Sequence, residues 1–325
     1  MSTTAVADFG RAVDAAVRAI EGWALRTPLV RLNVDDAPAE VWLKLECLQP
    51  IGSFKLRGAT NAIRSHDPAD LDGGVWTASA GNMAQGVAWV ARRLGIPATV
   101  VMPDTAPDTK RRAVERLGAR IVFVSYDRWW QTYRERAYPG IDGPFFHPFD
   151  DRRVQAGNGT IGLEILEDLP DVDTILVPWG GGGLSTGIAG AVRSHGSSAA
   201  VFAIEAEGAA PLHAALDAGR PVVLDDFRPS FADGIGGKTV FGPMFDLARE
   251  RLAGSIVATN AEIAYAVGLL MERNHVVAEG AGAAPVAAAL SGRAGTGRIV
   301  CIVSGGNIDS ARLQTILGGG VPEGH

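Results

Sequence analysis

Residues 177–184 read VPWGGGGL, and this stretch decides how the rest of the chain is interpreted. An apolar run that ends in glycines and then enters a helix-like segment is typical of a strand followed by an anion-binding turn, because backbone amides converge at the helix N-terminus. Two other interpretations of the stretch alone stay open. One is an ordinary tight turn, and the other is a loose dinucleotide fingerprint over Gly181, Gly183 and Gly187, with Glu205 as the ribose-binding acid.

Outward from this stretch, short apolar runs alternate with helix-like segments along most of the chain. The runs are rich in β-branched residues, which is typical of strands, and stripes of apolar residues at helical spacing lie between them. The predicted strands are residues 41–47, 75–78, 98–102, 121–124, 174–177, 201–204 and 298–303, and the clearest predicted helices are residues 83–94, 109–117, 154–166 and 184–193. The alternation predicts an α/β fold of the doubly wound class. The Pro- and Gly-rich stretch 138–148 is either a crossing between two domains or one long surface loop.

The overall composition limits the classes of protein that fit. The chain has 325 residues, 47% of them hydrophobic and 20% charged, which predicts roughly two globular domains. Lys and Arg total 30 against 36 Asp and Glu, so the net charge of −6 offers no electrostatic surface for nucleic acid or an anionic membrane. Cys47 and Cys301 lie far apart in apolar runs, and the sequence shows no signal peptide and no apolar run long enough to span a membrane. We therefore expect a cytoplasmic protein with neither nucleic-acid nor membrane partners.

Three further motifs carry groups suited to chemistry. Residues 53–59 read SFKLRGA and place Lys55 between apolar neighbours, where burial could lower the pKa of its amine by up to about 3 to 5 units and free it to form a Schiff base or accept a proton. Residues 79–83 read SAGNM after a predicted strand and could present amides to a carboxylate, although helix capping by the serine or the asparagine is the simpler interpretation. Residues 304–307 read SGGN after the last predicted strand. An isolated lysine is more often a solvated surface residue.

All four motifs lie at the carboxyl end of a predicted strand or at a turn before a helix, where open α/β sheets bind their ligands. Together they resemble the threonine/serine dehydratase family, whose members are fold-type II enzymes that depend on pyridoxal phosphate. The motifs occur in the family's order and spread over about 255 residues. A dinucleotide enzyme would leave the motifs of Lys55 and Ser304 without a role, so the resemblance argues against that alternative.

The resemblance implies two doubly wound α/β domains with the cofactor in the cleft between them. The large cofactor-binding domain would comprise residues 1–70 and 150–325, and a small mobile domain would comprise residues 71–149. It also implies that Lys55 holds the cofactor covalently and, once released, acts as the general base. The other cofactor-binding residues that it implies are Phe54, Asn82, Gly180, Gly181, Gly182, Gly183, Leu184 and Ser304. The substrate carboxylate would be bound by Ser79, Ala80, Gly81, Asn82 and Met83.

By the same resemblance, each cofactor-binding group has a separate role. Phe54 would lie against the cofactor ring, Asn82 would hydrogen-bond the ring hydroxyl, and the glycine loop would cradle the phosphate. Ser304 would face the pyridine nitrogen, and a hydroxyl, unlike a carboxylate, does not force that nitrogen to stay protonated. The ring is then a weaker electron sink, so loss of a β-leaving group is expected to win over transamination.

The activity that the resemblance implies is that of an ammonia-lyase, a homodimer that dehydrates a 3-hydroxy amino acid such as L-threonine or L-serine to a 2-oxo acid and ammonia. Two departures from the family's pattern leave alternatives open. Related racemases have a second serine where this chain has Ala80, which makes racemisation the weaker alternative. Dehydratases of the family commonly have His where this chain has Met83, which leaves a bulkier or acidic 3-hydroxy amino acid open. Outside enzymes, the alternative is a sensor or storage protein that binds pyridoxal phosphate without turnover.

We expect no metal ion at this site. Some relatives bind a divalent cation beside the phosphate loop, where Glu205 and the Ala209 carbonyl match but Pro211 replaces a carboxylate. Glu205 could equally be the N-terminal acid of a helix, a position that favours the helix dipole by roughly 0.3 to 1 kcal/mol. The six histidines show no spacing typical of zinc ligands.

Overall fold

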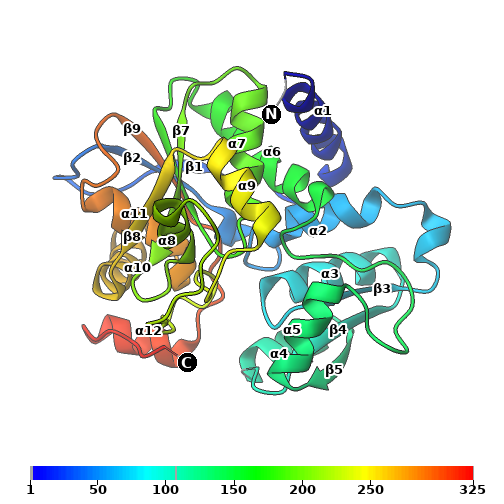
Figure 1. Ribbon diagram of the computed structural model, residues 1–325. Helices are drawn as coiled ribbons and strands as arrows, with labels where there is room; N and C mark the ends of the chain where they lie inside the picture. The colour runs from blue at the N-terminus through cyan, green and yellow to red at the C-terminus, as the bar shows by residue number, and fades with distance from the viewer. Residues whose placement is uncertain (1–2, 107, 325) are drawn as a thin grey trace.

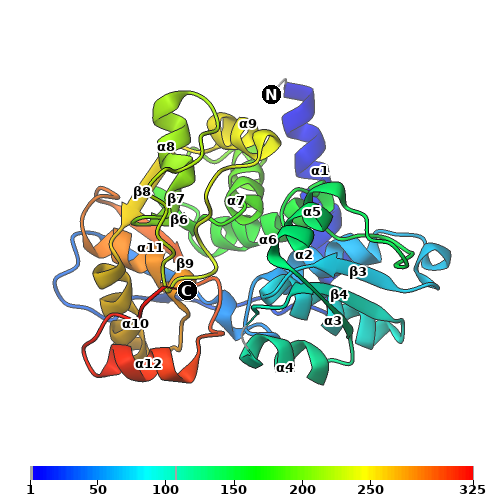
Figure 2. The same cartoon turned by 60° about the horizontal axis from the view of Figure 1, so that its bottom comes forward.

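Two separate β-sheets organise the chain, one of six strands and one of three (Figures 1 and 2). The computed structural model describes residues 3–106 and 108–324, so the outer limits of the predicted domains, at residues 1 and 325, lie outside the described residues. Among the helices of the described residues, none is long and apolar enough to cross a membrane.

The larger sheet is parallel except at one edge. Its strands are β1 (Leu29–Arg31), β2 (Glu40–Lys44), β6 (Thr174–Pro178), β7 (Ala200–Ala206), β8 (Gly254–Ala258) and β9 (Arg298–Ile302), in the spatial order β1-β2-β9-β6-β7-β8. Strand β1 pairs antiparallel with β2, and every other neighbouring pair is parallel. Parallel neighbours cannot be joined by tight turns, so long connections, usually helices, must link them.

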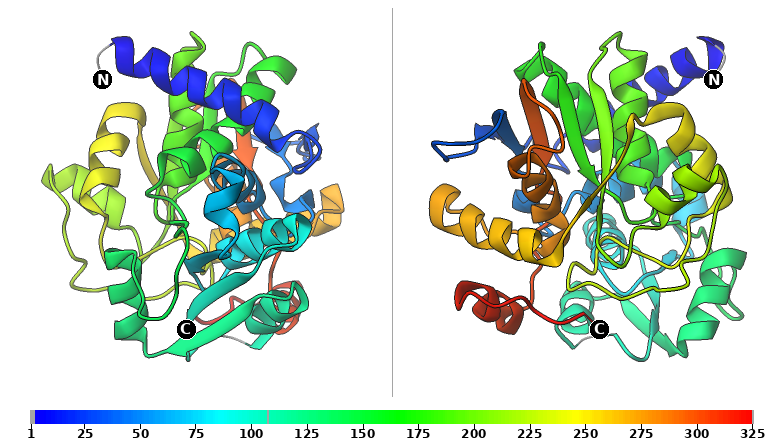
Figure 3. Two further views of the ribbon diagram at one scale, coloured as in Figure 1. Left: turned by 90° about the vertical axis from the view of Figure 1, so that its right-hand side faces the viewer. Right: turned by 60° about the vertical axis from the view of Figure 1, so that its left-hand side comes forward.

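Helices cover both faces of the larger sheet because its central strands are apolar on both sides. In β6, Leu176 packs in one hydrophobic cluster while Ile175 and Val177 pack in another, as the two-residue period of a strand requires. The first cluster includes α10 (Asn260–Asn274) and α11 (Gly280–Leu290), and the second includes α6 (Arg152–Asp168) and α7 (Gly183–Ser194). Helix α1 (Thr3–Ile20) lies along α6 and α7 (Figure 3). These layers confirm the predicted doubly wound class.

The smaller sheet is parallel throughout and also has helices on both faces. Its strands are β3 (Val75–Ala78), β4 (Ala98–Pro103) and β5 (Arg120–Val124), in that spatial order. Helices α3 (Asn82–Leu94) and α4 (Asp108–Arg116) share one hydrophobic cluster with the sheet, and α5 (Tyr126–Glu135) packs in the cluster on the other face. Helix α2 (Lys55–Arg64) packs against both α3 and α6, and so lies where the two sheets meet (Figure 1).

The Pro- and Gly-rich stretch 138–148 runs along the free edge of the smaller sheet. Phe145 forms a parallel bridge with Trp76 of β3. The Trp76 N–H donates to the Pro144 carbonyl (3.1 Å), and the Phe146 N–H donates to the Trp76 carbonyl (2.9 Å). Residues 144–146 are therefore attached to the edge of the smaller sheet, whereas residues 138–143 form a largely exposed loop.

The predicted elements agree closely with the observed ones. Each of the seven predicted strands overlaps an observed strand, and each of the four predicted helices matches an observed helix to within two residues at either end. The remaining helices are α8 (Pro211–Ala218), α9 (Gly242–Arg251) and α12 (Ser310–Leu317), with short 3-10 turns at η1 (Glu46–Leu48) and η2 (Pro68–Leu71).

Candidate active site

The four sequence motifs meet where the two sheets face each other, at the carboxyl ends of parallel strands. The glycine loop follows β6, residues 79–83 follow β3, and Ser304 follows β9. Backbone bonds join two motifs directly, since the Phe54 N–H donates to the Ser304 carbonyl (3.0 Å) and the Gly306 N–H donates to the Gly52 carbonyl (2.9 Å). The structure therefore brings the residues predicted from separate parts of the sequence to one edge of the fold.

Lys55 is the first residue of α2 and holds its amine in a protein interior. Its Nζ donates to the Pro148 carbonyl at 2.7 Å and lies 5.0 Å from the centre of the Phe54 ring. Burial lowers the pKa of this amine to about 8, because a low-dielectric surrounding disfavours the charged form. The position at a helix N-terminus disfavours a positive charge in the same direction. At pH 7, roughly a tenth of the amine is then neutral and nucleophilic.

A buried ion-pair network fixes the helix that carries this lysine. The Arg57 guanidinium, fully buried in the first turn of α2, pairs with Glu46 (2.8 Å) and Glu164 (2.6 Å). The Lys44 ammonium, also fully buried, pairs with the same Glu164 (2.6 Å). The nearby Arg57 cation keeps the pKa of the Glu46 carboxyl below its usual range despite burial. Such networks contribute geometry more reliably than stability, and this one ties α2 to the end of β2 and to α6.

The glycine loop has no room for side chains. A Cβ at Gly180 would lie 2.6 Å from the Gly234 carbonyl oxygen, and one at Gly181 would overlap the Phe149 ring. Gly182 has a φ of +89°, which glycine adopts at low cost, and it is the N-cap of α7 without a side chain to accept hydrogen bonds. The amides of the first turn of α7 therefore point out of the helix end, an arrangement suited to a phosphate.

Three other predicted residues, Phe54, Ser304 and Leu184, are all buried. Phe54, almost fully buried, is the N-cap of α2 and places its ring beside the lysine amine. Ser304 is buried at the end of β9. The Leu184 side chain packs in the hydrophobic cluster beneath α7, so only its backbone could contact a ligand.

Asn82 is the first residue of α3 and connects the smaller sheet to the larger one. Its Nδ2 donates to Glu279 Oε1 (2.9 Å), and its Oδ1 accepts from Asn307 Nδ2 (2.8 Å). The sequence interpretation missed Glu279, the N-cap of α11, although an acid directly before an Ala- and Gly-rich helix is a recognisable signal. Burial raises the pKa of the Glu279 carboxyl to about 7.

The remaining residues of the 79–83 loop form a tight turn. The Gly81 N–H donates to Ser79 Oγ (3.2 Å), and Gly81 itself is the N-cap of α3, without a side-chain cap bond. The simpler interpretation, in which a serine or asparagine side chain caps this helix, is therefore wrong. Met83 is buried in the hydrophobic cluster between α3 and the smaller sheet, so any influence of it on a substrate would be indirect.

Four uncharged aromatic side chains, Tyr133, His147, Phe149 and Phe241, form an aromatic wall beside Pro148, whose carbonyl accepts from the Lys55 amine. His147 Nδ1 accepts from the backbone N–H groups of Phe149 (3.3 Å) and Asp150 (2.9 Å). Burial lowers the pKa of this imidazole to about 3, so it stays uncharged at neutral pH. The rings of Tyr133, Phe149 and Phe241 lie 4.6, 4.6 and 6.1 Å from the His147 ring. This wall is therefore made of aromatic rings and carries no charge of its own.

Glu205 has the structural role considered for it from the sequence. Its two carboxylate oxygens accept from the backbone N–H groups of Leu212 and His213, both at 2.8 Å, at the start of α8. Oε2 also accepts from the Ser255 hydroxyl (2.5 Å). These bonds make Glu205 the acid that caps the N-terminus of α8, where it completes the first turn of the helix.

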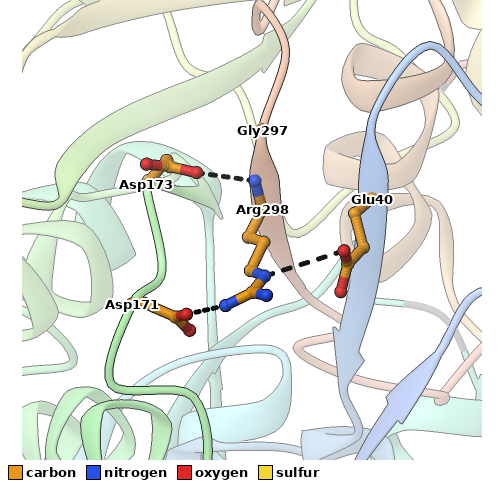
Figure 4. Close-up of a pocket in the computed structure, with 5 residues that line it drawn as sticks. All are labelled: Glu40, Asp171, Asp173, Gly297 and Arg298. Atoms are coloured by element: carbon orange, nitrogen blue, oxygen red, sulfur yellow. Dashed lines mark hydrogen bonds and ion pairs between the residues drawn. The ribbon is translucent and has the colours of Figure 1, made fainter.

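A surface hollow elsewhere in the molecule gathers acidic residues around one arginine (Figure 4). The Arg298 guanidinium pairs with Asp171 and, at 3.6 Å, with Glu40, while its backbone N–H donates to Asp173 (2.8 Å). Arg298 opens β9, whereas the candidate site lies at the other end of that strand, about 20 Å away. The hollow is therefore an ion-pair cluster at the amino ends of the strands and is separate from the site.

A protein-family model described as "Pyridoxal-phosphate dependent enzyme" matches residues 20–305. The chain belongs to this family. Like other members, it uses pyridoxal phosphate as its cofactor.

Individual relatives are similar to the chain over most of its length. The chain is 40% identical to an L-threonine ammonia-lyase of Thermotoga maritima over 95% of this chain and 78% of the relative. Among solved structures, a threonine deaminase from T.th. superimposes with a TM-score of 0.85 at 34% identity, covering 92% of this chain and 98% of that one. Maize serine racemase superimposes with a TM-score of 0.86 at 32% identity, covering 95% and 96% of the two chains.

The residues of the site fit this cofactor. A lysine amine of lowered pKa is available for a covalent bond to an aldehyde, and the four glycines leave the first amides of α7 without covering side chains. The flat Phe54 ring lies beside the amine. The donor set thus combines an amine, an anion cradle and an aromatic surface, as an aromatic aldehyde phosphate requires.

Proposed function

We propose that the chain is a pyridoxal-phosphate-dependent ammonia-lyase that dehydrates a 3-hydroxy amino acid of the L-threonine or L-serine type to a 2-oxo acid and ammonia. The observation that carries this proposal is the Lys55 amine, whose pKa is lowered to about 8 and which lies at the junction of the four motifs. The names of the relatives, L-threonine ammonia-lyase and threonine deaminase, support the same reaction.

In this proposal the chain's own groups divide the work of holding the cofactor. Lys55 would bind it covalently, and the amides of Gly180 to Leu184 would hold its phosphate. Asn82 would donate its free N–H to the ring hydroxyl, and the Ser304 hydroxyl would meet the pyridine nitrogen. Phe54 would pack against the ring.

The reaction removes the α-proton and the β-hydroxyl, which leaves as water once it has taken up a proton, and hydrolysis of the resulting enamine would give the 2-oxo acid and ammonia. When bound, pyridoxal phosphate withdraws electrons from the substrate and so acidifies its α-carbon. The Lys55 amine, released when the substrate takes its place, accepts the α-proton because it is neutral above pH 8. The backbone amides of residues 79–83 would hold the carboxylate. We expect residues 71–149 to close over the substrate as a small mobile domain and exclude water.

Two features argue against the alternatives of racemisation and of an acidic substrate. Ala80 has no hydroxyl that could return a proton from the opposite face of the substrate, which weakens the case for racemisation even though a serine racemase has a similar structure. The wall of Tyr133, His147, Phe149 and Phe241 is uncharged, and so offers no cation to an acidic substrate side chain. A small apolar substituent, such as the methyl group of threonine, suits this wall better than a carboxylate does.

We further propose that the protein is a cytoplasmic homodimer. Two unpaired cysteines, both with pKa values raised by burial, suit a reducing compartment. Size-exclusion chromatography with light scattering tests the dimer, and a mass of one chain would refute it.

The test of the function is an absorbance spectrum of the purified protein before and after addition of L-threonine or L-serine, with 2-oxo acid and ammonia assayed together. The expected result is a visible band at roughly 410 to 420 nm that shifts as both products accumulate. The matched control, Lys55→Ala, should show neither the band nor the products. A stable band without products from any 3-hydroxy amino acid would instead favour a sensor or storage protein.

A further inference from the structure

Both ends of the Asn82 side chain are held by residues of the larger sheet's half of the molecule. Its Nδ2 donates to Glu279 Oε1 (2.9 Å), and its Oδ1 accepts from Asn307 Nδ2 (2.8 Å). Asn307 Nδ2 also donates to the Ile51 carbonyl (2.9 Å), which fixes the direction in which this amide donates. The Asn82 amide therefore stands in a chain of bonds that runs from Glu279 to Ile51.

The chemistry of these partners leaves a single orientation for the Asn82 amide. An ionised carboxylate can only accept, so the NH₂ end of Asn82 must face Glu279. Asn307 uses its own NH₂ group as the donor, so the carbonyl end of Asn82 must face Asn307. An amide nitrogen carries two hydrogens, and only one of them is used by Glu279. The other remains for a ligand.

We propose that Glu279 is a positioning residue that fixes the Asn82 amide with its second N–H directed to the ring hydroxyl of the cofactor. The inference rests on the proposed function, because it takes Asn82 as a group that contacts the cofactor. Glu279 itself sits tightly against the SGGN motif, since a Cβ at Gly305 would lie 2.4 Å from Glu279 Oε1. The carboxylate thus packs against the Gly305 backbone while it accepts from Asn82.

This arrangement depends on the charge of Glu279. Burial raises the pKa of its carboxyl to about 7, with the Asp233 anion acting in the same direction, while the Lys110 cation and the Asn82 bond act against it. Burial, with smaller contributions from the Glu46 and Glu279 charges, raises the pKa of the neighbouring Cys47 thiol to about 12, so this thiol does not titrate near neutrality. A protonated carboxyl can donate as well as accept, so below pH 7 only the bond from Asn307 still constrains the Asn82 amide, and its Nδ2 end is no longer fixed.

The pH dependence of cofactor affinity tests this inference. The holoenzyme is dialysed to equilibrium against graded pyridoxal phosphate at pH 6 and pH 8, and bound cofactor is read from its visible absorbance. Glu279→Gln cannot ionise and, like a protonated carboxyl, can donate as well as accept, so it fixes the Asn82 amide no better at pH 8 than at pH 6. If only the ionised form fully fixes the Asn82 amide, the wild type should bind pyridoxal phosphate about tenfold more tightly than Glu279→Gln at pH 8 and within about twofold of it at pH 6.

Comparison of two proteins at one pH cancels the titration of Lys55, which both share. The exposed Glu272→Gln on α10 removes one carboxylate far from the site and should follow the wild type at both pH values. Glu279→Leu, which has no acceptor, should bind the cofactor about tenfold more weakly than wild type at pH 8, and thermal melts of the three variants show whether each is folded.

The outcomes separate this inference from the function on which it rests. Equal pH dependence in wild type and Glu279→Gln, with the cofactor bound in both, would overturn the positioning role alone. Failure of the wild type to bind pyridoxal phosphate at pH 8 would overturn the proposed function and this inference with it.

Discussion

A methyl group added at Gly181 tests whether the glycine loop must be free of side chains. Built on the backbone, its Cβ lies 1.9 Å from Cδ1 and 2.1 Å from Cε1 of the Phe149 ring. Non-bonded carbon atoms prefer a separation of about 3.5–4.0 Å, so the loop or the ring must move by roughly 1.5 Å or more. Overpacking of this kind costs about 1–3 kcal/mol, and the rigid ring leaves few ways to reduce that cost.

A displaced glycine loop should lower both the affinity for the cofactor and the thermal stability. If the loop moves, its amides move away from the phosphate, and each 1.4 kcal/mol lost raises the dissociation constant by a factor of about ten. We expect Gly181→Ala to bind pyridoxal phosphate at least about tenfold more weakly in equilibrium dialysis and to melt at a lower temperature. The matched control is Gly242→Ala at the start of α9, where a Cβ would meet no atom within 4 Å.

A double variant locates the origin of the effect. In a Phe149→Ala background the ring that blocks the methyl group is gone, so Gly181→Ala should cost much less affinity there than in the wild type. The reasoning would be refuted if Gly181→Ala bound the cofactor and melted as the wild type does. It would also be refuted if the loss were the same with and without the Phe149 ring.

Further predictions concern the base, the buried arginine and the loop that faces the substrate. The pKa of about 8 at Lys55 predicts that kcat falls about tenfold for each pH unit below 8, because the base must be neutral to accept the α-proton, and a profile that stays flat from pH 6 to 9 would contradict this role. Arg57→Met leaves Glu46 buried without its cation and should lower the free energy of unfolding by about 3–5 kcal/mol in urea titrations, whereas the exposed Arg31→Met should change it little. Ala80→Ser should introduce measurable D-serine from L-serine, detected by chiral chromatography, and its absence would show that more than one hydroxyl separates elimination from racemisation.

Seven strands and four helices could be predicted because their sequences carry a local period. Strands β6 and β9 are continuous apolar runs, and α3 shows an apolar stripe that ends at Gly95, which has a φ of +73° at its C-cap. Helix α11 escaped prediction because it reads GAGAAPVAAAL and is buried almost all around, so it has no polar face to reveal a helical period. Strand β1, with three residues, is too short to carry a pattern.

The candidate site could be predicted as a set of positions but not as a set of contacts. Strand ends and helix starts mark where ligands bind in a doubly wound fold, so residues 79–83, 180–184 and Ser304 could be found from the sequence. The side chains that hold those residues in place could not be found from the sequence. Arg57 is held by Glu164, 107 residues away, and no local pattern relates the two.

The sequence by itself determined which chemical groups are present and which backbone segments carry them, because turns, glycines and apolar periods act over a few residues. Only the tertiary structure decided which groups meet and how strongly each holds a proton. Lys55 contacts a carbonyl 93 residues away, and Asn82 contacts Glu279 across 197 residues. Their pKa values follow from burial and from charges brought near by folding, and these depend on distances in space that sequence separation does not encode.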